Sequence, residues 1–183
     1  MQTWEWIVVI VAAAILVVLA AAFVQIRRRR SHLKERFGAE YYRTVASEGT
    51  SSGEKHLSQV EHEHEKLDLR PLPRAARDRY LEEWRNAEAR FISDPREATR
   101  AAERIVERAL DERGYPTADD TDGDTGRAAV VAVDHADVAE RYRHGHAMLD
   151  KVDGNEGTEN LRKAMLDFRA VLDELLDASR TAA

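Results

Sequence analysis

The sequence predicts an all-α protein in which one N-terminal transmembrane helix precedes a cytoplasmic antiparallel helical bundle. An apolar stretch of membrane-spanning length lies near the N-terminus, and amphipathic segments with helical spacing follow it. No segment shows the sustained two-residue alternation that is typical of a β-strand. We therefore expect residues 1–30 to form the anchor, 31–70 a juxtamembrane helix and hinge, and 71–183 the bundle.

The stretch 7–26 is long enough to cross a bilayer. It is apolar except for Gln25, and about 20 such residues are needed to span the hydrocarbon core. Trp4 and Trp6 stand at its outer end, where indole rings favour the headgroup level. A cleaved signal peptide is the alternative. We favour the anchor because no basic segment precedes the stretch, which also exceeds the apolar length that is usual in signal peptides.

A basic run follows the apolar stretch directly and consists of Arg27, Arg28, Arg29 and Arg30. No lysine or arginine precedes the stretch. By the positive-inside rule, this asymmetry predicts a single pass through the plasma membrane, with the N-terminus outside and the C-terminal domain in the cytoplasm. The four guanidinium groups are also expected to contact anionic headgroups of the lipid bilayer, at about 1 kcal/mol each.

Composition restricts the classes of function. The chain has 28 basic and 34 acidic residues, and without the four arginines and Glu5 the segment 31–183 has a formal charge of −9. This sign argues against nucleic acid as a partner. The chain contains no cysteine, which excludes disulfides, thiolate metal sites and cysteine nucleophiles.

Two short helices are expected between the anchor and the bundle. Their apolar faces are Leu33, Phe37, Tyr41 and Val45 in the first and Leu57, Val60, His64 and Leu67 in the second. Gly38 is expected to break the first helix. The stretch "EGTSSGE", residues 48–54, is interpreted as a flexible break, and the prolines of "LRPLPR" as a linker.

About four amphipathic helices are expected to form the bundle. Three of their faces are Tyr80, Trp84, Ala87 and Phe91, then Ala98, Ala102, Ile105 and Ala109, and finally Leu161, Met165, Phe168, Leu172 and Leu175; the remaining helix is expected over about 134–150. Asp94, Asp134 and Thr158 are the expected N-caps, and Gly114 is the expected left-handed terminator. Residues 117–127 are interpreted as a solvated loop, and 128–133 as a lead-in to the next helix rather than a lone strand.

Several histidine and acidic motifs fail a geometric test for metal binding. His62 and His64 project to nearly opposite faces of a helix, and His135 and His146 would lie about 16 Å apart along one. The acidic loop around residue 123 resembles a calcium loop but has Ala129 where an acidic ligand is required. Nucleophile-elbow and phosphate-loop motifs are missing as well. We therefore expect no catalytic residue, no metal site and no cofactor.

One predicted helix carries a basic ridge formed by Arg96, Arg100, Arg104 and Arg108. Acidic residues flank the ridge, namely Glu97, Glu103, Glu107 and Asp111. A self-neutralised, solvated face is favoured over a phosphate-binding stripe, because acidic and basic side chains at helical spacing pair with each other.

We hypothesise that five polar residues border one groove: Tyr115, His135, Tyr142, Arg143 and Arg162. His135 and Tyr142 share a helical face, and the turn after Gly114 leads toward that helix. Arg143 and Arg162 neighbour core positions and could pair with Asp134 or Glu159, or accept an anionic group. The structural alternative is that these residues are core side chains with satisfied polar tips and ion-paired arginines.

The chain resembles a family of bacterial, chiefly actinobacterial, single-pass membrane-anchored helical proteins of unknown function. The stretches that carry the resemblance are "RFGAEYYRTV", "AEARFISDPREATRAAERIV", "RGYP", "VDHADVAERYRHGHA" and "TENLRKAMLDFRAVLDELL". Ala136 departs from the family pattern, which more often has proline at this position. The resemblance implies that the anchor and the helical domain form one unit, and it implies no activity.

These observations favour a membrane-tethered cytoplasmic module for protein interaction or scaffolding. Its partner would be another protein or a second copy of the chain, since the last helix could also pair as a short coiled coil. The alternative is a ligand-binding or hydrolytic helical domain that uses a polar groove around the "GYP" turn and the helix expected over about 134–150.

Overall fold

The computed structural model describes the backbone of residues 3–151 and 157–181, and side chains from residue 9 to 177 except 124 and 152–156. Within these ranges all regular structure is helical, in eight helices without a strand, which confirms the predicted all-α class. Trp4 and Trp6 fall within the first helix, but their side chains lie outside the described residues.

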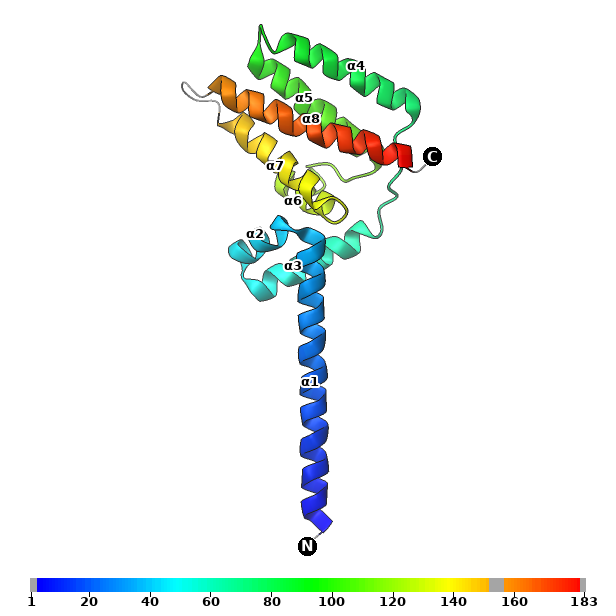
Figure 1. Cartoon of the computed structure of the whole chain (residues 1–183), viewed down its shortest axis with the longest axis vertical. Helices are drawn as coiled ribbons and strands as arrows, with labels where there is room; N and C mark the ends of the chain where they lie inside the picture. The colour runs from blue at the N-terminus through cyan, green and yellow to red at the C-terminus, as the bar shows by residue number, and fades with distance from the viewer. Residues whose placement is uncertain (1–2, 152–156, 182–183) are drawn as a thin grey trace.

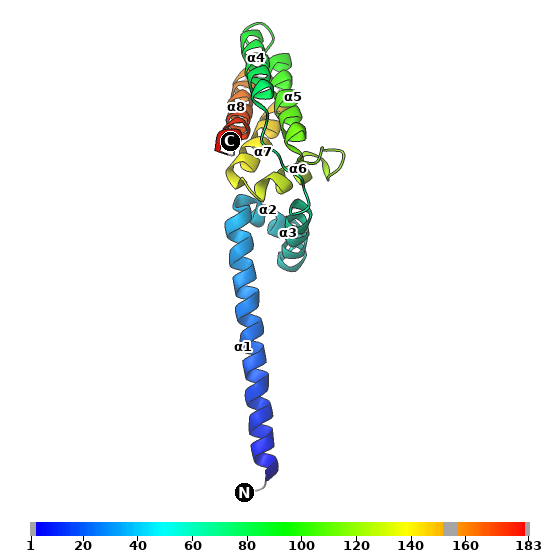
Figure 2. The same cartoon turned by 90° about the vertical axis from the view of Figure 1, so that its right-hand side faces the viewer.

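The first helix, α1 (Thr3–Phe37), extends away from the rest of the molecule as a single rod (Figures 1 and 2). Its 35 residues correspond to a length of about 52 Å. Residues 9–32 are exposed, so the apolar half is not the core helix of a soluble domain. In the described part of the chain, α1 is the one helix long and apolar enough to cross a membrane.

The chain leaves α1 through two short helices, α2 (Ala39–Glu48) and α3 (Thr50–His64). Gly38 separates α1 from α2 with a φ of 53°, as predicted. The prediction of a flexible break at 48–54 is wrong, because Gly49 alone separates the helices and α3 begins at Thr50. Gly53 lets α3 approach α2 closely, since a Cβ there would lie 3.1 Å from the carbonyl oxygen of Thr44.

An extended linker leads to the helical pair α4 (Arg74–Arg90) and α5 (Pro95–Arg113). The Asp94 side chain caps α5 by accepting a hydrogen bond from the Glu97 N–H at 3.1 Å. Gly114 terminates α5 with a φ of 96°, and a Cβ there would meet the Asp68 carbonyl oxygen at 2.6 Å. The cap and the terminator were both predicted. Their local chemistry needs no knowledge of tertiary structure.

The predicted loop and lead-in between α5 and the next helix contain a helix of their own, α6 (Gly123–Ala132). The interpretation of 117–127 as loop is therefore wrong from residue 123 onward, and the interpretation of 128–133 as a lead-in is also wrong. Every residue from 127 to 133 is buried, which explains why the segment shows no amphipathic spacing. Arg127 is buried in this segment and forms an ion pair with Asp111 of α5.

Two predicted N-caps, Asp134 and Thr158, are wrong. The last two helices are α7 (Ala136–Asp150) and α8 (Gly157–Thr181). The residue that precedes α7 is His135, whose side chain makes no capping bond, and Asp134 instead lies 2.9 Å from His64 Nε2. Thr158 lies inside the first turn of α8, because the helix begins at Gly157. The Asp134 carboxylate, which local rules assign to the N-cap of α7, instead contacts His64 of α3.

The helices α7 and α8 run antiparallel and form the most extensive contact in the protein (Figure 1). Helix α5 packs on α8, and α4 packs on α5 at the outer edge. The predicted apolar positions of α8 are all buried, namely Leu161, Met165, Phe168, Leu172 and Leu175. Gly145 of α7 lies directly against Phe168, so the absence of a side chain at residue 145 permits this close packing.

The segment before residue 70 packs on the bundle. Helix α1 contacts α6, α2 contacts α7 and α3 contacts α6. Leu33 and Phe37 at the end of α1 are buried in the same apolar core as the bundle helices. The Arg36 Nε–H donates to the Val133 carbonyl oxygen at 3.2 Å. We call this contact between α1–α3 and α6–α7 the joint. The division of the chain into an anchor at 1–30, a juxtamembrane helix and hinge at 31–70 and a bundle at 71–183 stays a prediction.

Candidate functional site

Tyr115 is a core residue in this structure. It is buried beside His64, with ring centroids 6.3 Å apart. Burial raises the pKa of Tyr115 to about 12, an effect that the Arg113 charge opposes and the Asp134 charge reinforces. Its hydroxyl has no hydrogen-bond partner among the described residues. The "GYP" turn therefore does not present this phenol to solvent.

His135, just before α7, and Tyr142, within α7, are buried to different degrees. His135 is partly exposed, with Nδ1 3.8 Å from Glu174 Oε1 of α8. Tyr142 is buried and meets the His146 ring edge-on, with centroids 4.4 Å apart. The two residues were expected to share a helical face, but His135 precedes α7 and its backbone is not helical, whereas Tyr142 packs inward.

Arg143 connects three helices. One of its terminal nitrogens lies 2.7 Å from Glu40 Oε1 of α2 and donates to the Thr125 carbonyl oxygen of α6 at 2.9 Å. Burial lowers the pKa of the Arg143 guanidinium, and the Glu40 carboxylate opposes this effect. Arg143 was expected to pair with Asp134 or Glu159, and its partner in the structure is Glu40.

Arg162 is exposed on α8 and makes the predicted pair with Glu159 through two hydrogen bonds of 2.8 and 2.7 Å. These bonds lower the pKa of the Glu159 carboxyl. Arg162 also lines a groove between α4 and α8 that none of the other four hypothesised residues lines. A binding role for the five residues stays a hypothesis, and the structure does not bring them together in this groove.

The groove between α4 and α8 has a volume of about 310 Å³ and a mostly apolar wall. We call it the α4/α8 groove, and its lining residues are Trp84, Glu88, Phe91, Arg162, Met165, Leu166 and Arg169. The Leu166 side chain is 55% exposed, which is unusual among the large apolar residues of α4–α8. Both α4 and α8 pack on α5, and the groove lies between the sides of α4 and α8 that face each other.

Trp84 provides the buried part of the groove wall. Its ring is almost fully enclosed, and the Arg169 guanidinium lies 5.5 Å from the ring centroid. The Trp84 Nε1–H has no acceptor among the described residues. A buried donor of this kind costs free energy unless a partner satisfies it.

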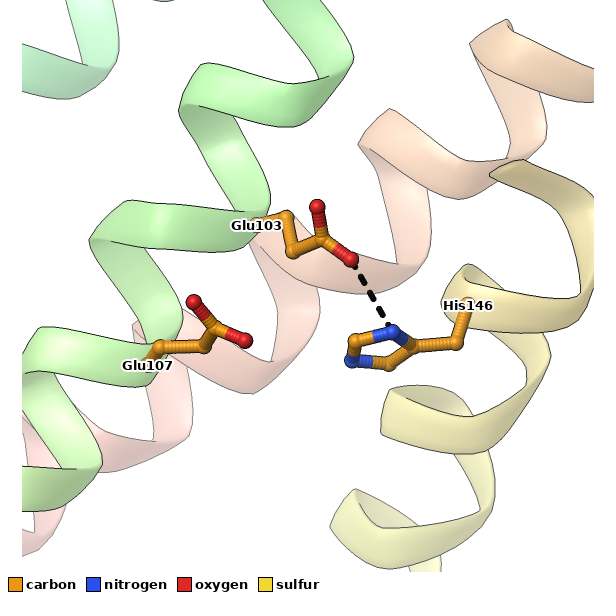
Figure 3. Close-up of side chains that lie close together, drawn as sticks. All are labelled: Glu103, Glu107 and His146. Atoms are coloured by element: carbon orange, nitrogen blue, oxygen red, sulfur yellow. Dashed lines mark ion pairs between the residues drawn. The ribbon is translucent and has the colours of Figure 1, made fainter. Parts of the chain in front are cut away.

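A second polar feature lies on another side of α5, where Glu103 and Glu107 face His146 of α7 (Figure 3). Each residue offers one potential ligand atom, and these atoms all lie within 4.8 Å of one another. His146 Nδ1 is 3.0 Å from Glu103 Oε1. We call these three residues the carboxylate–histidine cluster.

Local structure explains how the cluster forms. The two glutamates are four residues apart on α5 and therefore share a helix face. The His146 ring is held edge-on between Tyr142 and Phe168, at centroid distances of 4.4 and 5.4 Å. Glu103 and His146 are mostly shielded from solvent, at 21% and 13% exposure.

Glu103 and Glu107 were expected to pair with the arginines of the basic ridge. In the structure the ridge uses other carboxylates, because Arg104 pairs with Glu97 at 2.7 Å and Arg108 pairs with Glu83 of α4. The four-residue spacing of Glu103 and Glu107 beside a buried face could have identified them as a carboxylate pair on one side of the helix. Their proximity to His146, in contrast, depends on how α5 and α7 pack, which spacing within one segment cannot reveal.

Comparison of the chain with protein-family models, with curated proteins and with solved structures found no match. The functional assignment therefore rests on the geometry described above.

Proposed function

We propose that the protein is a membrane-tethered interaction module whose α4/α8 groove binds an acidic amphipathic helix of a partner protein. The observation that carries the proposal is an exposed, mostly apolar groove with two arginines on its rim. Apolar grooves between helices commonly bind the apolar face of an amphipathic helix. The proposed location is the cytoplasmic face of the plasma membrane, with the N-terminus of α1 outside.

The distribution of arginines at the end of the apolar stretch supports the proposed anchor. Arg29 donates to Ser58 of α3 at 2.7 Å, and Arg30 lies 2.9 Å from Glu54. Arg27 and Arg28 are exposed on α1 and suit anionic headgroups. Helix α3 would then lie near the membrane surface.

Helical continuity supports a fixed placement of the groove. Helix α1 runs without a break from the apolar stretch into the core, where Leu33 and Phe37 are buried. A domain held in this way samples few orientations relative to the bilayer. Tethering to a surface also raises the effective concentration for a partner in the same membrane, so a groove of modest size can act there.

Charge on the rim supports an acidic occupant. Arg162 pairs with Glu159 three residues away in an exposed position, and Arg169 pairs with Asp173 four residues away in a partly buried one. Ion pairs within one helix that are open to solvent stabilise it only slightly, so a carboxylate of the partner can replace either intrahelical one at little cost.

Photo-crosslinking from the groove tests the proposal. A photoreactive residue at Leu166 is expected to crosslink in native membranes to one face of an acidic amphipathic helix in another protein. The matched control is the same residue at Lys163, which is exposed on α8 but does not line the groove. Leu166→Glu should abolish recovery of that partner, whereas Lys163→Glu should not.

Three results would contradict the proposal. The first is crosslinking from Leu166 only to a second copy of this chain, which would make the groove a self-association surface. The second is equal crosslinking from residues 163 and 166. The third is retention of the same partner by the Leu166→Glu variant, provided that its thermal unfolding is unchanged.

A further inference from the structure

We propose that the carboxylate–histidine cluster binds one divalent first-row transition-metal ion between α5 and α7. This site is separate from the α4/α8 groove and does not depend on the proposed function. Its ligands would be one carboxylate oxygen each from Glu103 and Glu107 and one ring nitrogen of His146 (Figure 3).

Geometry is the first argument. Zinc takes nitrogen and oxygen ligands at about 2.0–2.2 Å in a tetrahedral arrangement, which places neighbouring ligand atoms about 3.4 Å apart. The separation between Glu103 Oε1 and His146 Nδ1 is already 3.0 Å, and no separation among the three ligand atoms exceeds 4.8 Å. The remaining closure is at most about 1.4 Å, which rotation of glutamate side chains supplies without moving the backbone.

The combination of ligands is the second argument. Two carboxylates and one imidazole lie together in a partly shielded place. Carboxylate oxygens and imidazole nitrogens are ligands that a divalent ion such as zinc takes.

The donor set selects the class of ion. Imidazole together with carboxylates suits zinc, manganese, iron(II) or cobalt(II), and a site without sulfur does not favour copper(I). The aromatic rings of Tyr142 and Phe168 hold the imidazole in place before an ion binds, so less conformational entropy is lost on binding. Three protein ligands would leave a further position for water.

Calorimetric titration of the full-length chain in detergent with Zn²⁺ tests the proposal. The expected result is saturable binding of one ion per chain. His146→Gln and Glu107→Gln should each weaken binding by at least about tenfold. The matched controls are His144→Gln and Glu97→Gln, which change an exposed, ion-paired histidine on α7 and an exposed, ion-paired glutamate on α5. Both controls should bind as the wild type does.

A readout of folding accompanies the titration. Bound Zn²⁺ should raise the thermal unfolding midpoint of the wild type and of both controls, and it should not raise that of the ligand variants. If His146→Gln does not fold, then Glu103→Gln and Glu107→Gln, which preserve side-chain shape, decide the question.

The outcomes that overturn the proposal are distinct. One is the absence of saturable wild-type binding up to about 1 mM Zn²⁺. Another is one-to-one binding that persists undiminished in the cluster variants, which would place the ion elsewhere, for example among the exposed histidines and glutamates of α3. Equal weakening by the controls and the ligand variants would also reject the cluster.

Discussion

The α7–α8 interface and the joint are held together by different chemistry. Along α7–α8 the buried contacts are mostly apolar, and the pair between His144 and Asp167 lies at the edge, where His144 is exposed. In the joint, the well-shielded carboxylate of Glu40 meets the guanidinium of Arg143, and Asp134 meets His64. The bundle therefore needs only apolar residues of suitable volume, whereas the joint needs specific partners.

This contrast predicts different tolerance to substitution. An apolar interface can be repacked at modest cost if the total volume is kept. A shielded ion pair has already lost hydration on both sides, so removing one partner leaves an uncompensated charge. We infer that the joint determines the orientation of the domain relative to α1 and tolerates substitution less well than the α7–α8 interface.

The largest effect is expected at the joint. Arg143→Ala should lower the free energy of unfolding by about 3 kcal/mol, because the shielded Glu40 carboxylate would keep only its more exposed partner Arg43. Glu40→Ala should have a similar effect. Denaturant titration of the detergent-solubilised chain measures both values, and the double variant completes a thermodynamic cycle. Additive effects in the cycle would show that the two residues are not coupled.

The next effect tests the apolar interface. Gly145→Ala would place a Cβ 2.8 Å from Phe168 Cε1, so we expect a loss of about 1–3 kcal/mol from overpacking. Phe168→Leu should recover part of this loss in the double variant, because the smaller side chain makes room. Thermal unfolding measures the change. An unchanged midpoint in Gly145→Ala would contradict the close packing of α7 on α8.

A smaller effect is expected at Tyr115, a buried residue of the joint region. Tyr115→Phe should leave the free energy of unfolding at neutral pH unchanged or raise it by up to about 1 kcal/mol, because the hydroxyl has no partner among the described residues. A loss of more than that would reveal a hydrogen bond or a ligand that depends on this hydroxyl.

The same residue predicts a dependence on alkaline pH. The folded pKa of Tyr115 is raised from 10.0 to about 12, so the folded state retains its proton where the unfolded state loses it. Ionisation of Tyr115 therefore leaves the free energy of unfolding unchanged below pH 10. As the pH rises from 10 toward about 12, this free energy declines at about 1.4 kcal/mol per pH unit. Tyr115→Phe should show a shallower decline, measured by denaturant titration at pH values between these limits.

The smallest effect is expected at Arg162. Its pair with Glu159 is exposed and lies within one helix, so Arg162→Ala should leave the thermal unfolding midpoint nearly unchanged. The same substitution should weaken capture of the groove partner. A loss of stability comparable to that of Arg143→Ala would contradict the distinction between surface pairs and the joint.

Much of the fold could be predicted from local pattern. The helix faces around Trp84, Ile105 and Phe168 follow from the spacing of apolar residues, and the ends of α5 follow from Asp94 and Gly114. Helix α6 was missed because a helix that is buried on all sides has no polar face to give periodicity. The Asp134 cap was wrong because a tertiary partner, His64, takes its carboxylate.

The candidate sites were harder to predict for a related reason. The pair of Arg162 with Glu159 lies within one helix and was predicted, whereas the pair of Arg143 with Glu40 spans more than a hundred residues. The α4/α8 groove and the carboxylate–histidine cluster exist only once helices distant in sequence pack. The spacing of residues within one segment shows which residue types share a helix face, but it does not show which residues of other segments lie next to them.

The most direct test of the account is a measurement of topology by cysteine labelling. The chain contains no cysteine, so Gln2→Cys and Ile92→Cys each introduce a single thiol, and Ile92 is 93% exposed in the helical domain. In intact cells, a membrane-impermeant maleimide should label the thiol at residue 2 and should label the one at residue 92 only after lysis. Labelling at residue 92 in intact cells would contradict the proposed membrane-tethered cytoplasmic module.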